Sequence, residues 1–452
     1  MSTRLPIGDP RSFPALVAAL ACLAGCGNPS GPLDIRDVRQ LRQDPSAYVQ
    51  VGELDRPLIE PGGQQELFRR FRQAWLAPWD PAAPGPSSGD IHGPFAAFDA
   101  ELGYGENLRP HTKEFAHALM DNATGRAVDA RAIAVANTNL RRLPTERPRF
   151  EEVSKAGEGF PFDTFQESAL WAGTPLRLWR VTRDGRWGLV DSPAGRGWTP
   201  MRDLATVDEQ TARLYHERLL VSLMRDHVTV GDSQGAAAVV THIGAVFPLL
   251  SDRGRDLEVL LPVRDAEGRC LRRAAVLSKD EASVMPAPAT PRTVATLAGG
   301  MVGQPYCWGG MLEGRDCSAT VRDILIPLGI PLPRNSADQA AAWASIPLKH
   351  LPPQQRERVI LEQGRPFLSL VRFPGHIALY LGQHEGRAII LHNAWGIRTR
   401  RGGVQGRKIV GRCVITTLQP GMELPDIDLP RGDLRNSIES LVLVGQAKPA
   451  GP

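Results

Sequence analysis

The chain has 452 residues, which is too long for one compact core, and typical domain sizes predict about three folded units. Hydrophobic residues make up 42% of the chain and charged residues 23%, a balance typical of a folded soluble protein, and no run of 18 apolar residues predicts a transmembrane helix. The net charge is only +4, from 53 basic and 49 acidic residues, and without a dense Lys/Arg block this excludes nucleic acid as an expected partner.

The N-terminus carries an export signal. Arg4 and Arg11 precede an apolar run, Phe13 to Ala24, whose length suits a signal-peptide core and is too short to span a membrane. The run ends in Leu23-Ala-Gly-Cys26, which resembles a bacterial lipobox, where the cysteine is lipidated and becomes the first mature residue. We therefore expect residues 1–26 to be a lipoprotein signal peptide with Cys26 as the lipidation site. The protein would then be exported and anchored to a membrane on the periplasmic side of the bacterial cell envelope. An ordinary signal peptide is the alternative.

The spacing of the cysteines predicts neither a zinc site nor a particular set of disulfides. They are Cys22, Cys26, Cys270, Cys307, Cys317 and Cys413. Export and lipidation would leave four, widely separated and without a Cys-x-x-Cys pair, so we expect no metal site and no cofactor. An exported protein can form disulfides, but these spacings do not say which ones.

Residues 27–135 are expected to hold a tether rich in Pro and Gly, followed by a small, mostly helical module. Leu67 to Leu76 mixes apolar and basic residues at helical spacing. Parts of residues 102–136 show a similar pattern.

Short strands joined by tight turns follow. Thr174 to Val181 alternates like a strand, Asp184-Gly185 is a hairpin turn signal, and Arg186 to Val190 is a second strand. A third strand opens at Gly195 in the run Gly-Arg-Gly-Trp. This layout resembles bacterial SH3-like domains, so we expect a small barrel over residues 136–205.

A similar layout recurs about 70 residues further on. Gly244 to Leu250 and Leu257 to Val263 read as strands around a turn at Arg253-Gly254, which predicts a second SH3-like barrel over residues 206–285. Pro286 to Pro291 reads as a linker.

The final domain, residues 290–450, is predicted to be α+β. Apolar side chains between Cys317 and Leu328 recur at helical spacing, which predicts one helix with a single buried face. Later, His376 to Leu381 and Ala388 to His392 form two apolar strands around the five-residue turn Gln383 to Arg387.

Cys317 is the candidate nucleophile. It follows a glycine-rich approach and stands where the predicted helix begins, so the helix dipole should favour its thiolate over its thiol. A thiolate is the nucleophile that amide cleavage needs, and the backbone N–H groups of the first turn can hold a developing oxyanion.

Two histidines can complete such a centre. His376 begins the first of the two strands and is the best candidate for the base. If Gly382 pairs with Ala388 across the turn, His392 lies opposite Ala378, on the face of His376, where a second imidazole can hold the first in a useful tautomer. A slip of one residue would move His392 to the other face. Asn393 is a competing third member.

The final domain resembles the NlpC/p60 family of papain-like cell-wall cysteine peptidases. The matching segments are Tyr306-Cys-Trp-Gly-Gly310, Asp316-Cys-Ser318, Pro333-Arg-Asn-Ser336, Gly375-His-Ile-Ala-Leu-Tyr380 and Leu391-His392. The resemblance implies that Cys317 is the nucleophile, His376 the base and His392 the polar third member. It also implies that Tyr306 lies by the oxyanion. Residues that it places near the substrate are Asp316, Ser318, Arg334 and Ser336.

The upstream modules extend the resemblance. Asn139 to Thr145 and Phe162 to Ser168 look like the first barrel of multidomain members, which carry a helical N-terminal segment, two SH3-like domains and this catalytic domain. In such members the first barrel closes one side of the active site. The resemblance therefore implies peptidoglycan stem peptides with a free N-terminal L-Ala as substrates, cut between γ-D-Glu and the diamino acid.

Two other functions fit the same sequence. One is an N-acetylmuramoyl-L-alanine amidase or an acyltransferase on the same fold. The other is a non-catalytic lipoprotein whose barrels bind the wall, which the presence of Cys317, His376 and His392 argues against.

Overall fold

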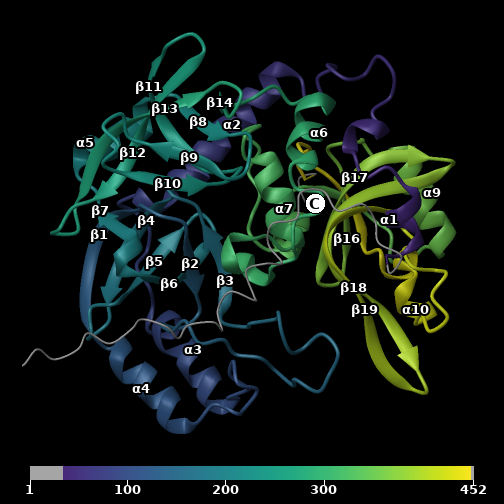
Figure 1. The fold of residues 1–452 in the computed structure, drawn as a ribbon, viewed down its shortest axis with the longest axis horizontal. Helices are drawn as coiled ribbons and strands as arrows, with labels where there is room; N and C mark the ends of the chain where they lie inside the picture. Colours follow the sequence, from purple (N-terminus) through teal and green to yellow (C-terminus); the bar gives the residue numbers. More distant parts are fainter. Residues whose placement is uncertain (1–33, 449–452) are drawn as a thin grey trace, which may run out of the picture.

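The computed structural model describes residues 34–448 (Figure 1). The predicted signal peptide and Cys26 lie outside these residues. Within residues 34–448 no helix has both the length and the apolar character needed to cross a membrane. The four cysteines of this part of the chain, Cys270, Cys307, Cys317 and Cys413, are all free.

The N-terminal helices do not form a separate body but spread over the later modules (Figure 1). They are α1 (Arg36–Gln40), η2 (Pro45–Tyr48), α2 (Pro61–Leu76), η3 (Ala77–Trp79), α3 (Ser88–Ala100) and α4 (Lys113–Ala123). The buried face of α2 carries Phe71 and Trp75, which share one apolar cluster with Ile133, Tyr215 and Ile326 from three later segments of the chain. Helix α2 therefore ties the β modules to the C-terminal domain.

The first barrel is a seven-stranded sheet in the order β3-β2-β6-β5-β4-β1-β7. Its strands are β1 (Arg126–Ala134), β2 (Thr138–Arg141), β3 (Gln166–Leu170), β4 (Pro175–Val181), β5 (Trp187–Ser192), β6 (Gly195–Pro200) and β7 (Leu204–Thr206), with η4 (Met201–Asp203) before the last. Strands β4 and β5 pair around Asp184-Gly185, as the turn signal predicts. The sheet begins at Arg126, ahead of the expected start at 136, because β1 pairs with both β4 and β7.

The second β module follows helix α5 (Glu209–Glu217). Its five-stranded sheet has the order β13-β12-β11-β8-β14, beside the hairpin β9-β10. The strands are β8 (Leu220–Leu223), β9 (Val228–Gly231), β10 (Ala238–Thr241), β11 (Val246–Asp252), β12 (Asp256–Arg264), β13 (Cys270–Ser278) and β14 (Ala282–Val284). The expected hairpin around Arg253-Gly254 is β11-β12.

The C-terminal domain places helices against both faces of a six-stranded sheet, in the order β15-β20-β16-β17-β18-β19. Its helices are α6 (Pro291–Gly299), η5 (Trp308–Glu313), α7 (Cys317–Leu325), α8 (Ser336–Ala341), α9 (Pro353–Gln363), α10 (Leu429–Gly432) and η6 (Leu434–Ser437). Its strands are β15 (Ala344–Pro347), β16 (Leu370–Phe373), β17 (His376–His384), β18 (Arg387–Arg401), β19 (Val404–Thr417) and β20 (Ser440–Leu443). The predicted architecture, an α+β domain preceded by SH3-like β modules and N-terminal helices, is confirmed.

Two local predictions in this domain are wrong. Helix α7 ends at Leu325 rather than at Leu328, because Pro327 has no backbone N–H to continue it. The hairpin turn is Glu385-Gly386 rather than the five residues from Gln383, with both residues at positive φ.

Candidate active site

Cys317 stands at the first position of α7, where the sequence places it. The Asp316 side chain caps this helix: its Oδ1 accepts a hydrogen bond of 2.9 Å from the Ala319 N–H. The Cys317 thiol lies against the backbone N–H groups of Ser318 and Ile377. Ile377 follows His376 at the start of β17, so the packing of α7 on this strand brings nucleophile and candidate base together.

His376 and His392 lie on one face of the β17-β18 pair. Their Nε2 and Nδ1 atoms are 2.8 Å apart. A β-bulge between Tyr380 and Gly382 offsets the shift caused by the shorter turn, so Leu379 pairs with Leu391. Continued by one residue, this register puts His392 opposite Ala378, as the sequence suggested.

A chain of hydrogen bonds fixes the tautomers of both imidazoles. The Thr416 hydroxyl donates to the Thr417 carbonyl at 2.8 Å, so its oxygen is left to accept from His392 Nε2 at 3.1 Å. His392 Nδ1 must then accept from His376 Nε2. His376 Nδ1 is therefore unprotonated and free to accept the proton of Cys317. Thr416 is fully buried, and no sequence pattern singles it out.

Burial keeps the resting centre neutral. Desolvation, with a smaller contribution from the nearby Asp316 carboxylate, raises the pKa of the Cys317 thiol to about 12. Desolvation also lowers the pKa of His376 to about 4, with a smaller contribution from Arg372, and lowers the pKa of His392 well below its usual value. The expected resting thiolate is therefore wrong: desolvation outweighs the helix dipole, and the thiol gives up its proton only as it attacks.

Asn393, the competing third member, faces away from His376. Its Nδ2 donates to the Arg315 carbonyl at 2.8 Å, from the opposite side of β18. The structure thus places His392, and not Asn393, beside the base.

The other predicted residues divide into two groups. Arg334 donates to Asp316 Oδ2 at 2.7 Å and to Ser318 Oγ at 2.9 Å, and its Nε reaches Ser168 of the first barrel at 2.9 Å. All four side chains are buried, so this network anchors the start of α7 to β3. Ser336 does not belong to it: it begins α8, half-buried, and lines no part of the groove beside the histidines.

That groove has a volume of ≈ 630 Å³ and an aromatic wall. Tyr306 lines it, and burial raises the pKa of the Tyr306 phenol far above its usual value, so its hydroxyl stays a donor. Phe162, in the loop before β3 of the first barrel, meets Tyr306, Trp308 and Trp395 with ring centroids 5.2 to 6.3 Å apart. The first barrel therefore supplies part of the groove. Sequence reasoning did not single out Trp395, the residue of β18 that meets Phe162.

The far part of the groove is basic. Arg398, Arg407 and Arg431 line it. Desolvation lowers the pKa of Arg407 most, and the positive charges of Arg398 and Arg431 lower it further. No block of basic residues marks this cluster in the sequence, because the hairpin β18-β19 and helix α10 assemble it.

Gly309 and Gly310 explain the Trp-Gly-Gly segment. Both have positive φ, and an added Cβ would lie 2.5 Å from the Gln166 carbonyl oxygen and 2.7 Å from the Ala169 amide nitrogen, respectively. Only glycine allows this approach of the backbone to β3. Gln166 Nε2 completes the contact by donating to the Gly309 carbonyl at 3.1 Å.

Such a site can perform acyl transfer. It offers a thiol nucleophile with the Ser318 backbone N–H beside it, an imidazole with a free Nδ1, and the Tyr306 hydroxyl as a donor in the groove. Within residues 34–448 no group of three His, Cys, Asp or Glu side chains is placed to hold a metal ion.

Three family models match the chain. The NLPC_P60 stabilising domain, N term, matches residues 15–126, the SH3 domain of the SH3b1 type matches 148–200, and the NlpC/P60 family matches 303–401. The C-terminal domain belongs to the NlpC/P60 family. Together with the Cys317 site, this makes the protein a cysteine peptidase.

One solved structure agrees with this assignment over nearly the whole chain. An NlpC/P60 endopeptidase from Photobacterium damselae subsp. piscicida is 25% identical, with 93% of this chain and 100% of that chain covered and a TM-score of 0.81. An NlpC/P60 family protein from Bacillus cereus ATCC 10987 is 17% identical, with 69% and 98% covered and a TM-score of 0.46. No curated protein sequence matches the chain.

Proposed function

We propose that this NlpC/P60 protein is an endopeptidase that hydrolyses peptidoglycan stem peptides between γ-D-Glu and the diamino acid, in peptides with a free N-terminal L-Ala. The observation that carries the proposal is the ordered chain Thr416–His392–His376, which ends one residue before Ile377, whose backbone N–H lies against the Cys317 thiol.

In the proposed reaction, His376 Nδ1 takes the thiol proton as Cys317 Sγ attacks the γ-carbonyl carbon of D-Glu. The oxyanion that forms is held by first-turn amides of α7 and by the Tyr306 hydroxyl. The proton on His376 then passes to the leaving amine of the diamino acid, which leaves a thioester. A water molecule, deprotonated by His376, attacks the thioester, releases the carboxylate and restores the thiol.

Two features favour short, acidic peptides as substrates. The loop of the first barrel that carries Phe162 and Gly157 lines the groove beside Tyr306, which suits a peptide terminus better than the middle of a cross-linked strand. Beyond His392, the groove carries Arg398, Arg407 and Arg431, which suit the carboxylates of a stem peptide.

We also propose that the protein reaches this substrate as a lipoprotein of the cell envelope, lipidated at Cys26. The lipobox of the sequence supports this proposal. Metabolic labelling with an azido fatty acid tests it: wild-type protein should take up the label, and Cys26→Ala should not.

Mass spectrometry of digested muropeptides tests the cleavage. We expect L-Ala-γ-D-Glu as the released dipeptide from free stem peptides, and no reaction when the L-Ala amine is joined to N-acetylmuramic acid. Release of intact stem peptide from muramoyl peptides would instead identify an amidase. Cys317→Ala should be inactive but folded, and a variant that cleaves as fast as the parent would overturn the mechanism.

A further inference from the structure

Two loops of the second β module contact the residues just before the nucleophile. The loop between β8 and β9 contributes Asp226, and the loop between β10 and β11 contributes His242. Asp226 pairs with Arg315, and His242 pairs with Glu313. The module therefore contacts both ends of residues 313–315, which lead directly into the N-cap and the first residue of α7.

The pair between Asp226 and Arg315 is buried and bidentate. Arg315 Nη1 and Nη2 donate to different oxygens of Asp226, each at 2.8 Å, and the two side chains are at most 6% exposed. Arg315 Nε donates to Asp323 Oδ2 of α7, also at 2.8 Å. The Arg315 carbonyl accepts from the N–H of Cys307, the neighbour of Tyr306, at 2.8 Å. A shift of Arg315 would therefore reach both the nucleophile helix and the segment that carries Tyr306.

The turn before Arg315 depends on contacts from the β modules. Leu312 and Glu313 have φ values of 53° and 59°, a left-handed conformation that residues with a side chain rarely adopt. Such a backbone persists where neighbouring groups hold it. Leu312 is 80% exposed and gains little from packing. The Glu313 carboxylate, in contrast, meets His242 Nε2 at 3.1 Å and accepts from Asn137 Nδ2 of the first barrel at 2.7 Å.

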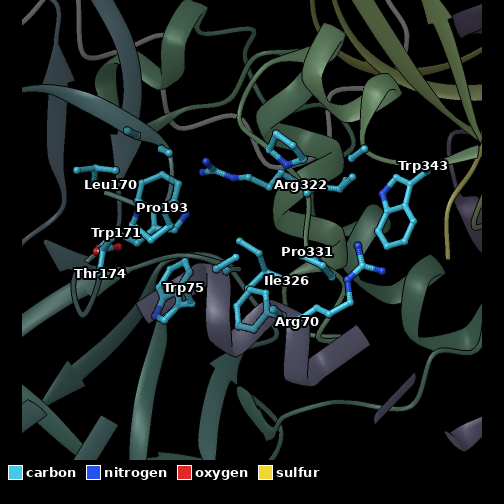
Figure 2. A pocket seen from close by; sticks show the side chains of 18 residues that line it. Arg70, Trp75, Leu170, Trp171, Thr174, Pro193, Arg322, Ile326, Pro331 and Trp343 are labelled. Carbon is cyan, nitrogen blue, oxygen red and sulfur yellow. The ribbon is translucent and has the colours of Figure 1, made fainter. Parts of the chain in front are cut away.

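Trp171 of the first barrel completes this junction. Its indole N–H donates to Asp323 Oδ2 at 3.1 Å, and its ring centroid lies 4.8 Å from that of His242 and 5.5 Å from the Arg315 guanidinium carbon. Figure 2 shows Trp171 on the first-barrel wall of a cavity that Arg322 of α7 also lines. Both β modules and the C-terminal domain therefore meet at one buried, charged junction behind the start of α7.

We propose that the second β module positions the nucleophile, with Asp226 and His242 as positioning residues that hold residues 313–315. Neither side chain lines the groove. Loss of either contact frees the turn and shifts Cys317 relative to His376, so it lowers kcat and leaves KM nearly unchanged. A misplacement of about 1 Å is enough to cost roughly 100-fold in rate.

Asp226→Asn tests the proposal, because it keeps the shape of the side chain and removes its charge. With L-Ala-γ-D-Glu-diaminopimelate, well below the unfolding temperature, we expect kcat to fall about 10- to 100-fold and KM to change less than about twofold. Hydrogen exchange read by mass spectrometry should be faster than in the parent over residues 311–319 and unchanged over the β17-β18 pair. The exchange measurement needs no substrate, so it remains valid even if the enzyme cuts a bond other than the proposed one.

Arg72→Met is the matched control for general loosening of the same module. Arg72 of α2 donates to the carbonyls of Tyr215 and Arg218, at the end of α5 that leads into β8, and does not contact residues 313–315. It should lower the unfolding temperature and keep the parental kcat. An equal loss of kcat in Arg72→Met and Asp226→Asn would overturn the proposal.

Glu313→Gln serves even if Asp226→Asn fails to fold, because the Glu313 side chain is 54% exposed. It keeps an oxygen for Asn137 and removes the charge that faces His242. We expect kcat to fall at least about fivefold, with faster exchange over residues 311–319. A folded variant of either kind with parental kcat or parental exchange would overturn the proposal.

Discussion

Thr416 gives the sharpest test of the catalytic centre, because it touches neither Cys317 nor His376. In Thr416→Val the side chain keeps its shape but loses the oxygen that accepts from His392 Nε2. The buried N–H would then lack a partner, which costs about 1–3 kcal/mol. His392 can avoid this cost by moving its proton to Nδ1.

That change would reverse the hydrogen bond between the two histidines. His376 Nε2 would become the acceptor, its proton would move to Nδ1, and Nδ1 could no longer receive the thiol proton. At 1.36 kcal/mol per tenfold change, a preference of about 1–3 kcal/mol for the unproductive tautomer lowers kcat/KM by about 5- to 150-fold. We expect the loss in kcat rather than in KM.

The assay is steady-state cleavage of L-Ala-γ-D-Glu-diaminopimelate, with ¹⁵N chemical shifts of the imidazoles as a direct report of the tautomers. Thr416→Ser keeps the hydroxyl and serves as the matched control, with activity close to the parent. If Thr416→Val has parental kcat and parental imidazole shifts, the inferred proton order is wrong.

Three further predictions follow from the site and its supports. Burial lowers the pKa of His376 to about 4, so kcat/KM should fall only below about pH 5, with a midpoint near pH 4. A midpoint at the ordinary histidine value near 6.5 would contradict the neutral buried pair. Gly310→Ala should destabilise the protein more than Gly303→Ala in chemical denaturation. Both glycines have positive φ, which costs alanine about 1–2 kcal/mol, but only at Gly310 does a backbone atom, the Ala169 nitrogen, lie within 3 Å of the added Cβ. Arg407→Gln should raise KM for the acidic peptide by about tenfold at low salt and little at high salt. Arg401→Gln, on the exposed tip of the hairpin, should leave KM unchanged. Equal changes in KM for the two variants would show that the groove does not select charge.

The sequence by itself determined the local chemistry of the centre. Helical periodicity placed Cys317 at the start of a helix, and strand alternation placed His376 and His392 on one face, because both patterns depend only on near neighbours in the chain. The pairing at Leu379–Leu391 agreed with the predicted register only because the β-bulge offset the error in the turn.

Tertiary structure decided what surrounds that chemistry. Residues that meet across modules, such as Phe162 with Trp395 or Arg334 with Ser168, are more than 160 positions apart and leave no periodic trace. Tertiary structure also decided the protonation state of Cys317. Its position at the start of a helix favours the thiolate, but the packing of α7 against β17 removes water and raises the thiol pKa. Burial depends on what the rest of the chain places over a residue, which local sequence does not encode.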